Sequence, residues 1–419
     1  MKIHTPPDHC TLLSKHTRCG LPLSQWLDGN IGGQGLKAAL RSPEKIIQTI
    51  QDADLRGLGG SGFPTHKKWR LIANHQNQGN RYLICNGNED EPGTFKDCAL
   101  MEETPHQVIE GALIAAVAAG INYIIFYINP TQEAALHNMR HAIIQWQASP
   151  LFQLIEKHLA TKLQIEVIAS SGHYIGGEET AAIEVIEGRF PFPRGKPPYP
   201  LDRGIHKQPT LINNVETLAN VSHILRMGAQ WFQSQGLNNA AGTKLFCLSG
   251  DVASPGLYER PMGTTLNQLI TKYGNGLLEN KKPKAVFAGG PSSPVLTPKD
   301  FNIPLDFDSL AQQGASLGTG AMIVLTEGSS IIRAVDEFMA FFANASCGQC
   351  PPCKSGTYHA SLLLNKLLSK QASREDLDTL ISLGEILPSS GFCRLPDGAA
   401  MLLNSSLKHF RSEYEAALV

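Results

Sequence analysis

The chain has 419 residues, more than one hydrophobic core usually organises, so two or three domains are expected. Hydrophobic residues make up 42% of it and charged residues 17%, which are ordinary proportions for a soluble globular protein. The formal net charge is −1, so charge gives no reason to expect nucleic acid or an anionic membrane surface as a partner.

The N-terminus has no apolar run of the kind found in a secretory signal. The longest apolar stretch, residues 108–128, is nominally long enough to cross a bilayer. However, Glu110 interrupts it and Gly120 and Asn122 divide it into unlike halves, so we expect a helix followed by a buried strand and no membrane span. Nine cysteines without a signal indicate metal or redox chemistry in the cytoplasm rather than disulfides.

Up to about residue 75, the sequence predicts a helical lead-in that ends in a glycine-rich loop. From there to about residue 240, predicted strands alternate with helices, the pattern of a doubly wound α/β sheet. The expected strands are residues 82–85, 123–128 and 163–169, and the expected helices are residues 104–119, 132–147 and 178–187.

A proline-rich stretch, residues 190–209, follows the last of these helices, and its six prolines exclude a regular helix or sheet interior. The segment 243–327 has strands expected at 244–249 and 284–288 between Gly-Pro turns, which indicates a small α+β domain. The remainder of the chain is predicted to be helical. The expected helices are residues 331–343, 356–370, 373–387 and 397–414.

The strongest chemical motif is a cysteine triplet, Cys347, Cys350 and Cys353, with Cys393 further along the chain. Three thiolates at this spacing can hold one corner of an iron–sulfur cluster, and a distant fourth completes its ligands. Structural zinc, the competing interpretation, more often takes two separated Cys-x2-Cys pairs. The pattern therefore favours a [4Fe–4S] cluster over zinc or unliganded thiols, and prolines 351–352 are expected to hold the loop open between helices.

The second motif, residues 57–65, places four glycines in six positions. Such a loop lets backbone amides approach a flat or phosphorylated ligand, although an ordinary surface turn has the same composition. Three further segments could each complete a nucleotide site or have a structural explanation alone: a solvated acidic loop, helix-dipole complements, or a rigid turn. They are residues 86–94, residues 172–180, and the pair 196–200 and 212–217, which offers a rigid aromatic platform and paired amides.

Together and in this order, these motifs resemble the family of NADH-binding flavoprotein (F) subunits of respiratory complex I, also found in NAD-linked hydrogenases and formate dehydrogenases. The resemblance extends from about residue 50 to about residue 400. It implies a Rossmann-like FMN- and NADH-binding domain with an N-terminal lead-in over residues 1–240, a ubiquitin-like β-grasp domain over 241–328, and a helical [4Fe–4S]-binding domain over 329–419.

The resemblance also implies a set of site residues. Glu91 and Glu179 would act beside the flavin and the nicotinamide, and Phe63 and Tyr199 would stack on the nucleotide. Glu89 would face its ribose and disfavour NADPH. The expected cluster ligands are Cys347, Cys350, Cys353 and Cys393. The residues expected to bind FMN or NADH are Gly59, Gly60, Gly62, Phe63, Lys68, Asn86, Asn88, Glu89, Gly177, Glu178, Glu179, Tyr199, Asn213, Asn214 and Thr217.

The implied function is NADH oxidation by hydride transfer to FMN, followed by single-electron transfer to the [4Fe–4S] cluster. Electrons would then pass to partner chains, namely a thioredoxin-like [2Fe–2S] subunit and a further iron–sulfur or catalytic subunit. The expected location is the cytoplasm, with any attachment to a membrane complex made through partners.

Four positions depart from the family pattern. Leu58 replaces an Arg, Asn88 an Asp, Gly176 a Cys, and Leu71 an aromatic residue. Losing both members of an ion pair costs less stability than losing one member and leaving the other unpaired. The changes at Leu58 and Asn88 are therefore interpreted as compensatory. A catalytically impaired structural or regulatory homologue is the alternative function. A sodium-pumping Rnf-type NADH-binding subunit is another alternative. Subunits of that type carry two ferredoxin-like cysteine runs, which this sequence does not have.

Overall fold

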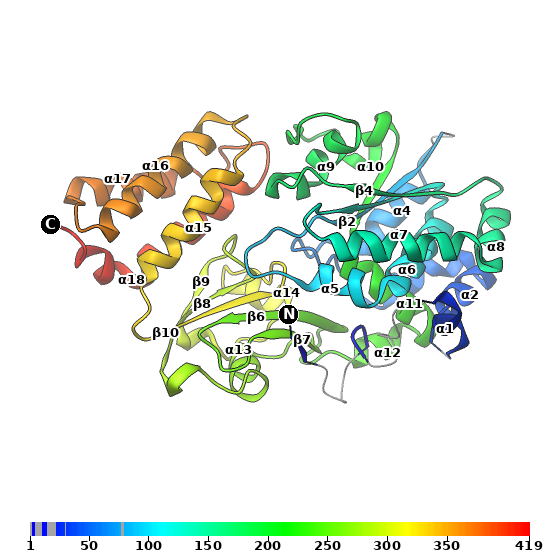
Figure 1. Ribbon diagram of the computed structural model, residues 1–419, viewed down its shortest axis with the longest axis horizontal. Coiled ribbons are helices and arrows are strands. Elements are labelled where there is room, and N and C mark those ends of the chain that lie inside the picture. Colours follow the sequence, from blue (N-terminus) through cyan, green and yellow to red (C-terminus); the bar gives the residue numbers. More distant parts are fainter. Residues whose placement is uncertain (1, 5–10, 15–21, 30, 77–78) are drawn as a thin grey trace.

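The computed structural model describes residues 2–4, 11–14, 22–29, 31–76 and 79–419. Part of the expected N-terminal helical lead-in therefore lies outside the described residues. In the described part, three groups of elements follow one another, as Figure 1 shows: an α/β group, a mixed sheet and a set of C-terminal helices.

A parallel sheet of four strands, in the order β4-β3-β2-β5, organises the α/β group. Its side chains alternate between two cores, as the two-residue period of a strand requires. Leu83 and Phe126 belong to the larger core and Ile84 and Ile125 to the smaller one, so both faces are covered. The strands are β2 (Tyr82–Gly87), β3 (Tyr123–Ile128), β4 (Gln164–Ala169) and β5 (Thr210–Asn214).

The predicted alternation of strands and helices is confirmed, and six elements are added that the sequence patterns did not indicate: α5, α8, α10, β5, α11 and α12. One of them, the short helix α10, lies inside the proline-rich stretch 190–209, so the exclusion of any helix there is wrong; its Pro200 stands at the first turn, where proline is tolerated. The larger core lies under helices from both ends of this group, because α11 packs beside α2 and α6. The helices of the group are α1 (Leu23–Asp28), α2 (Gln34–Arg41), α3 (Ile46–Asp52), α4 (Thr65–Ala73), α5 (Lys96–Glu103), α6 (Pro105–Ala119), α7 (Glu133–Gln147), α8 (Pro150–Leu159), α9 (Glu179–Ile186), α10 (Pro200–Arg203), α11 (Val215–Met227) and α12 (Ala229–Ser234).

The apolar stretch 108–128 divides as expected into helix α6 and strand β3. The helix stops at Gly120, which adopts a left-handed conformation (φ +64°) suited to glycine, and its amide bonds back to Ala116. Among the described residues, no helix has both the length and the apolarity that a membrane crossing requires.

The mixed sheet has the strand order β1-β7-β6-β10-β8-β9. Strand β10 pairs in parallel with β6 and antiparallel with β8, and it was not among the predicted strands. The two-residue strand β1 pairs with β7, so the start of the chain lies on this sheet and not on the first one. The strands are β1 (Ile3–His4), β6 (Thr243–Gly250), β7 (Gly256–Pro261), β8 (Pro283–Ala288), β9 (Val295–Leu296) and β10 (Ala321–Thr326); two short helices, α13 (Leu266–Gln268) and α14 (Phe307–Gln312), accompany them.

Four helices follow the mixed sheet and pack around a core that also includes Ala285 and Phe287 of β8. The expectation that prolines 351–352 hold a loop open is wrong, because they form the first turn of α16. A first turn needs no backbone N–H donors for its own hydrogen bonds, so proline is favoured there. The helices are α15 (Ile331–Ala345), α16 (Pro351–Leu368), α17 (Arg374–Ile386) and α18 (Leu395–Glu415).

Candidate active site

A cavity of about 480 Å³ lies where the three groups of elements meet. Its walls come from the glycine loop, the ends of β2 and β5, the turn before α9 and the start of α18. The carboxyl ends of parallel strands are where open α/β sheets bind ligands, and the volume suits a nucleotide. The predicted residues that line this cavity are Gly59, Gly60, Phe63, Lys68, Asn86, Asn88, Glu89, Glu91, Gly177, Glu178, Glu179, Asn213 and Asn214.

Three predicted ligand-binding residues do not line the cavity. Thr217 is buried, and its hydroxyl accepts a hydrogen bond from the Leu58 amide (2.8 Å), so it holds the glycine loop in place. Gly62 has φ +62°, and a Cβ there would come within 2.6 Å of the Phe307 ring, so packing requires this glycine. Tyr199 is 52% exposed outside the cavity.

The glycine loop closes on itself and leads directly into α4. The Gly57 amide donates to the Phe63 carbonyl (2.9 Å), and the Gly62 amide donates to the Gly57 carbonyl (3.2 Å). A Cβ on Gly59 would lie 3.0 Å from Cβ of Asn214, which is tight contact. The loop therefore brings its backbone against the end of β5, which larger side chains would prevent.

Lysines and glutamates pair on the wall formed by α4 and α9. Lys68 Nζ lies 3.9 Å from Glu179 Oε2, and Lys196 Nζ lies 2.7 Å from Glu179 Oε1 and 2.8 Å from Glu178 Oε1. Burial lowers the pKa of Lys68, and Glu179 partly offsets that effect. Lys196 was not predicted as a site residue; its position in the proline-rich segment gives no sign of these partners.

The acidic loop after β2 is held by hydrogen bonds at several of its polar residues. Asn86 donates to the Gly177 carbonyl (2.9 Å) and accepts from the Asn88 amide (3.1 Å). Glu91 accepts from the Tyr174 hydroxyl (2.6 Å) and from the Ser292 amide (3.1 Å), and its burial raises its pKa. Glu91 therefore ties the α/β group to the mixed sheet at the cavity wall.

Glu89 caps helix α5. Its two carboxylate oxygens accept from the backbone amides of Asp97 and Cys98, each at 2.9 Å. Burial and the nearby Asp97 raise the pKa of Glu89 to about 7, against the opposing effect of Lys96 and the two amides. The carboxylate thus has protein partners of its own, and its contact with a nucleotide ribose stays a prediction.

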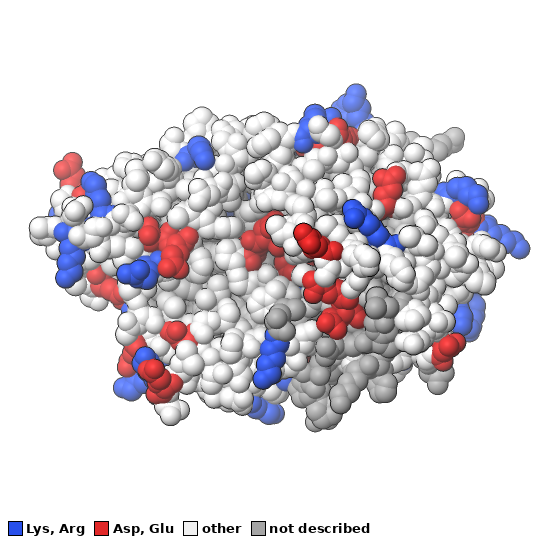
Figure 2. All heavy atoms as spheres, viewed as in Figure 1, with Lys and Arg blue, Asp and Glu red and all other residues white. Residues whose placement is uncertain are grey.

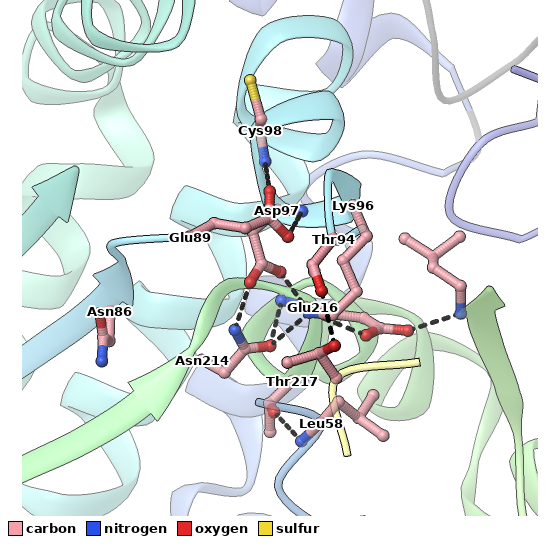
Figure 3. Close-up of polar contacts among 12 residues, drawn as sticks. Leu58, Asn86, Glu89, Thr94, Lys96, Asp97, Cys98, Asn214, Glu216 and Thr217 are labelled. Carbon is pink, nitrogen blue, oxygen red and sulfur yellow. Dashed lines mark hydrogen bonds and ion pairs between the residues drawn. The ribbon is translucent and has the colours of Figure 1, made fainter. Parts of the chain in front are cut away.

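A buried network of charges, of which Figure 3 labels Lys96, Asp97 and Glu216, adjoins the cavity, and Lys96 and Asp97 line it. Lys96 lies between Asp97 and Glu216, and Lys244 of β6 also contacts Glu216. Burial disfavours the charge of Lys96, but Asp97 and Glu216 outweigh burial and raise its pKa. No sequence pattern indicated this network, because its members lie on α5, α11 and β6.

The lining of the cavity is rich in acids. On the face drawn in Figure 2, Asp and Glu side chains gather near the middle, whereas Lys and Arg side chains lie mostly toward the edges. The charged lining residues are Glu89, Asp90, Glu91, Asp97, Glu178, Glu179 and Asp397 on the acidic side and Lys68, Lys96 and Arg394 on the basic side.

The four predicted cysteine ligands surround one small cavity between α15, α16 and the start of α18. The Phe392 amide donates to Cys350 Sγ (3.4 Å), as amides do to the sulfurs of iron–sulfur sites. Burial raises the pKa of Cys393 to about 12, and neighbouring thiolates add to the rise. Among the described residues, no three His, Cys, Asp or Glu side chains meet around a single ion position. The four thiols, which come from two segments of the chain, instead surround one cavity, and this arrangement fits a [4Fe–4S] cluster.

A nucleotide-sized cavity beside a four-cysteine cavity identifies the class: a redox protein with an organic cofactor and a metal cluster. Family models agree, since residues 50–223 match the Nuo51 FMN-binding domain and residues 333–417 match the NADH-ubiquinone oxidoreductase-F iron–sulfur binding region. The chain belongs to the family of F subunits of NADH-quinone oxidoreductases. It is an oxidoreductase with FMN and a [4Fe–4S] cluster as cofactors and NADH as substrate.

Individual relatives are similar over nearly the whole chain. The F subunit of the NADH-quinone oxidoreductase of Aquifex aeolicus (strain VF5) is 41% identical, over 92% of this chain and 88% of the relative. The F 2 subunit of the Rhizobium meliloti (strain 1021) enzyme is 38% identical, over 92% of both. A crystal structure of an NAD⁺-reducing [NiFe]-hydrogenase in the air-oxidised state superposes with a TM-score of 0.83 at 35% identity, over 96% of this chain and 68% of that chain.

Three of the positions that depart from the family pattern lie in different structural environments. Leu58 is 2% exposed, packs in the core of the mixed sheet and lines a second cavity, whereas Asn88 lines the main one. In this chain the two side chains therefore line different cavities, and their interpretation as a compensating pair stays a prediction. At Gly176, a Cβ would lie 2.6 Å from Ser171 Oγ and 3.2 Å from the Tyr127 hydroxyl, so these side chains occupy the space of the family's cysteine.

Proposed function

We propose that this chain oxidises NADH with FMN in the main cavity and sends the electrons out through a [4Fe–4S] cluster held by Cys347, Cys350, Cys353 and Cys393. The observation that carries the proposal is the position of Cys393, which lines both the main cavity and the small cavity of the cysteines. FMN and the cluster would then share one wall. When bound, FMN accepts a hydride from NADH, and the cluster accepts electrons one at a time.

The chain's own residues would bind and orient the reactants. The glycine loop and the amides of Asn213 and Asn214 would hold the flavin against the end of β5. Glu179, fixed by Lys68 and Lys196, would set the position of the nicotinamide. Such fixed geometry is what a hydride transfer requires.

Glu91, together with Glu179, is the proposed catalytic pair. The Glu91 carboxylate is held by Tyr174 and Ser292, so it would present a fixed negative potential beside the flavin. Phe63 is 43% exposed at the cavity wall and offers a face on which the nucleotide could stack. Tyr199, which lies outside the cavity lining, would stack on the adenine of the nucleotide. The acidic lining would disfavour NADPH, because its 2′-phosphate adds negative charge.

Three domains would share this work: a Rossmann-like domain over residues 1–240, a β-grasp domain over 241–328 and a helical domain over 329–419. In support, a separate main core lies at the parallel sheet, at the mixed sheet and among the four helices, although each core also takes in residues of a neighbouring group, such as Leu245, Phe287 and Leu58. Among the described strands, β1 alone crosses this division, because its two residues pair with β7.

We further propose that the chain works as a subunit in the cytoplasm and passes electrons to partner chains, a thioredoxin-like [2Fe–2S] subunit and a further iron–sulfur or catalytic subunit. Phe392 supports an exit near the cysteines, because this aromatic side chain is 57% exposed next to Cys393. Any attachment to a membrane complex would be made through those partners.

The proposal is tested on anaerobically purified, cluster-reconstituted protein by its FMN and iron content and by its ferricyanide reduction with NADH and NADPH. About one FMN per chain and NADH-specific turnover are expected. A Glu179→Gln variant should keep its iron and lose turnover, whereas Glu385→Gln on exposed α17 serves as the matched control. Iron without FMN, and no turnover with either nucleotide, would contradict the enzyme and leave a structural cluster-bearing subunit.

A further inference from the structure

Four charged side chains are buried where α5, α11, β6 and the glycine loop meet. Lys96 Nζ lies 2.6 Å from Asp97 Oδ1 and 3.1 Å from Glu216 Oε2. Lys244 contacts the same Glu216 carboxylate and also donates to the Leu58 carbonyl (3.4 Å). Two cations and two anions thus face one another, and the Glu89 carboxyl, whose pKa is raised to about 7, lies near Lys96 and Asp97. A buried group of this kind is costly unless every member stays paired.

Lys96 lines the main cavity, and its ammonium group is engaged by three protein side chains. An ammonium has three N–H donors. Lys96 Nζ donates hydrogen bonds to Asp97 Oδ1 (2.6 Å) and Asn214 Oδ1 (3.3 Å) and forms an ion pair with Glu216 Oε2 (3.1 Å). Dashed lines in Figure 3 mark contacts of Lys96 with this group. Lys96 thus offers a route by which the buried charges act on a bound cofactor through a neighbour.

That neighbour is Asn214, whose amide can take only one orientation. Its Oδ1 accepts from Lys96 Nζ and from the Glu216 amide (3.0 Å), and its Nδ2 donates to Asp97 Oδ2 (2.6 Å). An ammonium and a backbone N–H can only donate, and a carboxylate can only accept, so the reversed amide would lose all three bonds. The second Nδ2 hydrogen has no acceptor within the described part of the chain.

The adjacent Asn213 has the same polarity. Its Oδ1 accepts from the Trp69 indole N–H (2.8 Å), a group that only donates. Its Nδ2 therefore also remains available on the cavity side, where both asparagines line the wall. The end of β5 presents two amide donors, one fixed by an indole and the other by buried charges.

We propose that Lys96 and Asp97 are positioning residues that lock Asn214 as a hydrogen-bond donor to an acceptor atom of FMN. The inference rests on the proposed function, because it assumes that FMN occupies the main cavity. It adds a hydrogen-bonding preference to that function. The asparagines at the end of β5 would bind oxygen or nitrogen acceptors of the flavin and would reject donors.

The test separates positioning from simple stability by restoring the charge balance. Lys96→Met leaves an unpaired buried carboxylate, so both the melting temperature and FMN affinity should fall. Lys96→Met/Asp97→Asn leaves one cation and one anion, so the melting temperature should recover relative to the single variant. FMN should still bind about tenfold more weakly, because Asn214 loses both of its charged partners and keeps only the bond from the Glu216 amide to hold its orientation.

FMN affinity is measured by quenching of flavin fluorescence on deflavinated protein, with iron content and melting temperature recorded for each variant. Lys284→Met/Glu413→Gln removes another ion pair (2.6 Å), between β8 and α18, and should leave FMN affinity unchanged. Asp97→Asn alone, which keeps the side-chain shape, provides a second folded variant and should also weaken FMN binding.

Wild-type FMN affinity in a folded Lys96→Met/Asp97→Asn or Asp97→Asn variant would overturn the inference and leave the network a purely structural role. Wild-type protein that retains iron but binds no FMN would instead overturn the proposed function, and the inference with it. The two failures are thus distinguishable from the wild-type measurement alone.

Discussion

At the residue scale, Glu89 lies in an environment that opposes its own charge. It is buried beside Asp97, and these two influences together outweigh the attraction of Lys96 and two backbone amides. Its pKa of about 7, against 4.5 for an unperturbed glutamate, means that the folded chain holds this proton more tightly than the unfolded chain does.

The sign of the resulting pH dependence follows directly. A proton held more tightly in the folded state stabilises the fold below the raised pKa, so the free energy of unfolding should fall as pH rises from about 4.5 to about 7. Glu89→Gln cannot ionise and should lose this dependence. Urea unfolding of both proteins at several pH values across that window measures the difference.

Glu385→Gln, an exposed glutamate in α17, controls for the loss of one carboxylate and should follow the wild type. Parallel pH profiles for wild type and Glu89→Gln would show that the Glu89 carboxyl titrates normally, and would contradict the environment described for it.

Local patterns and the family resemblance predicted much of the cavity lining, but not the groups behind it. Asn214 and Glu89 lie in recognisable motifs, so their place at the cavity could be inferred. Lys96, Glu216 and Lys244 meet only after α5, α11 and β6 have packed, and no spacing in the sequence relates them. Contacts between distant segments of this kind depend on the tertiary fold, which is why the buried network was missed.

At the element scale, the contact between α6 and α11 depends on a glycine. A Cβ on Gly111 would lie 1.9 Å from the Leu218 carbonyl oxygen, so the two backbones approach as closely as a glycine allows. Gly111→Ala should force α6 and α11 apart and lower the free energy of unfolding by about 2–3 kcal/mol, measured by urea denaturation.

Gly356→Ala in α16 is the matched control, because its Cβ would meet flexible leucine side chains and no backbone, the nearest atom being Leu387 Cδ2 at 2.9 Å. Alanine also has the higher helix propensity, by about 1 kcal/mol, which offsets a small adjustment of Leu387. Equal destabilisation by both substitutions would indicate that the close approach of α6 and α11 is not what Gly111 provides.

Elements with a strong period were predicted well, and short or interrupted ones were not. Strand β3 stands out as six apolar residues after a glycine turn, and its bounds agree with the prediction. Strand β5 has five residues, follows a proline-rich segment and ends in two asparagines, so its composition indicates a loop. Its pairing with β2, in the register Ile84 to Ile212, supplies what local propensity lacks.

At the scale of the whole molecule, the main cavity unites residues that lie far apart in the chain. Gly59, Asn214, Ser292 and Cys393 all line it, and they come from the glycine loop, the parallel sheet, the mixed sheet and the start of α18. The site therefore exists only when the three groups of elements are assembled. Cys393 has a special place, because it borders the cysteine cavity as well.

The most direct test of this account follows electrons from NADH to the cluster within one chain. NADH is added anaerobically to the wild type and to Cys393→Ser, with flavin absorbance and the low-temperature EPR signal of the reduced cluster recorded together. The wild type should show flavin bleaching and the EPR signal, and Cys393→Ser should show bleaching alone. Flavin bleaching in the wild type without any cluster signal, although iron is present, would contradict the proposed path.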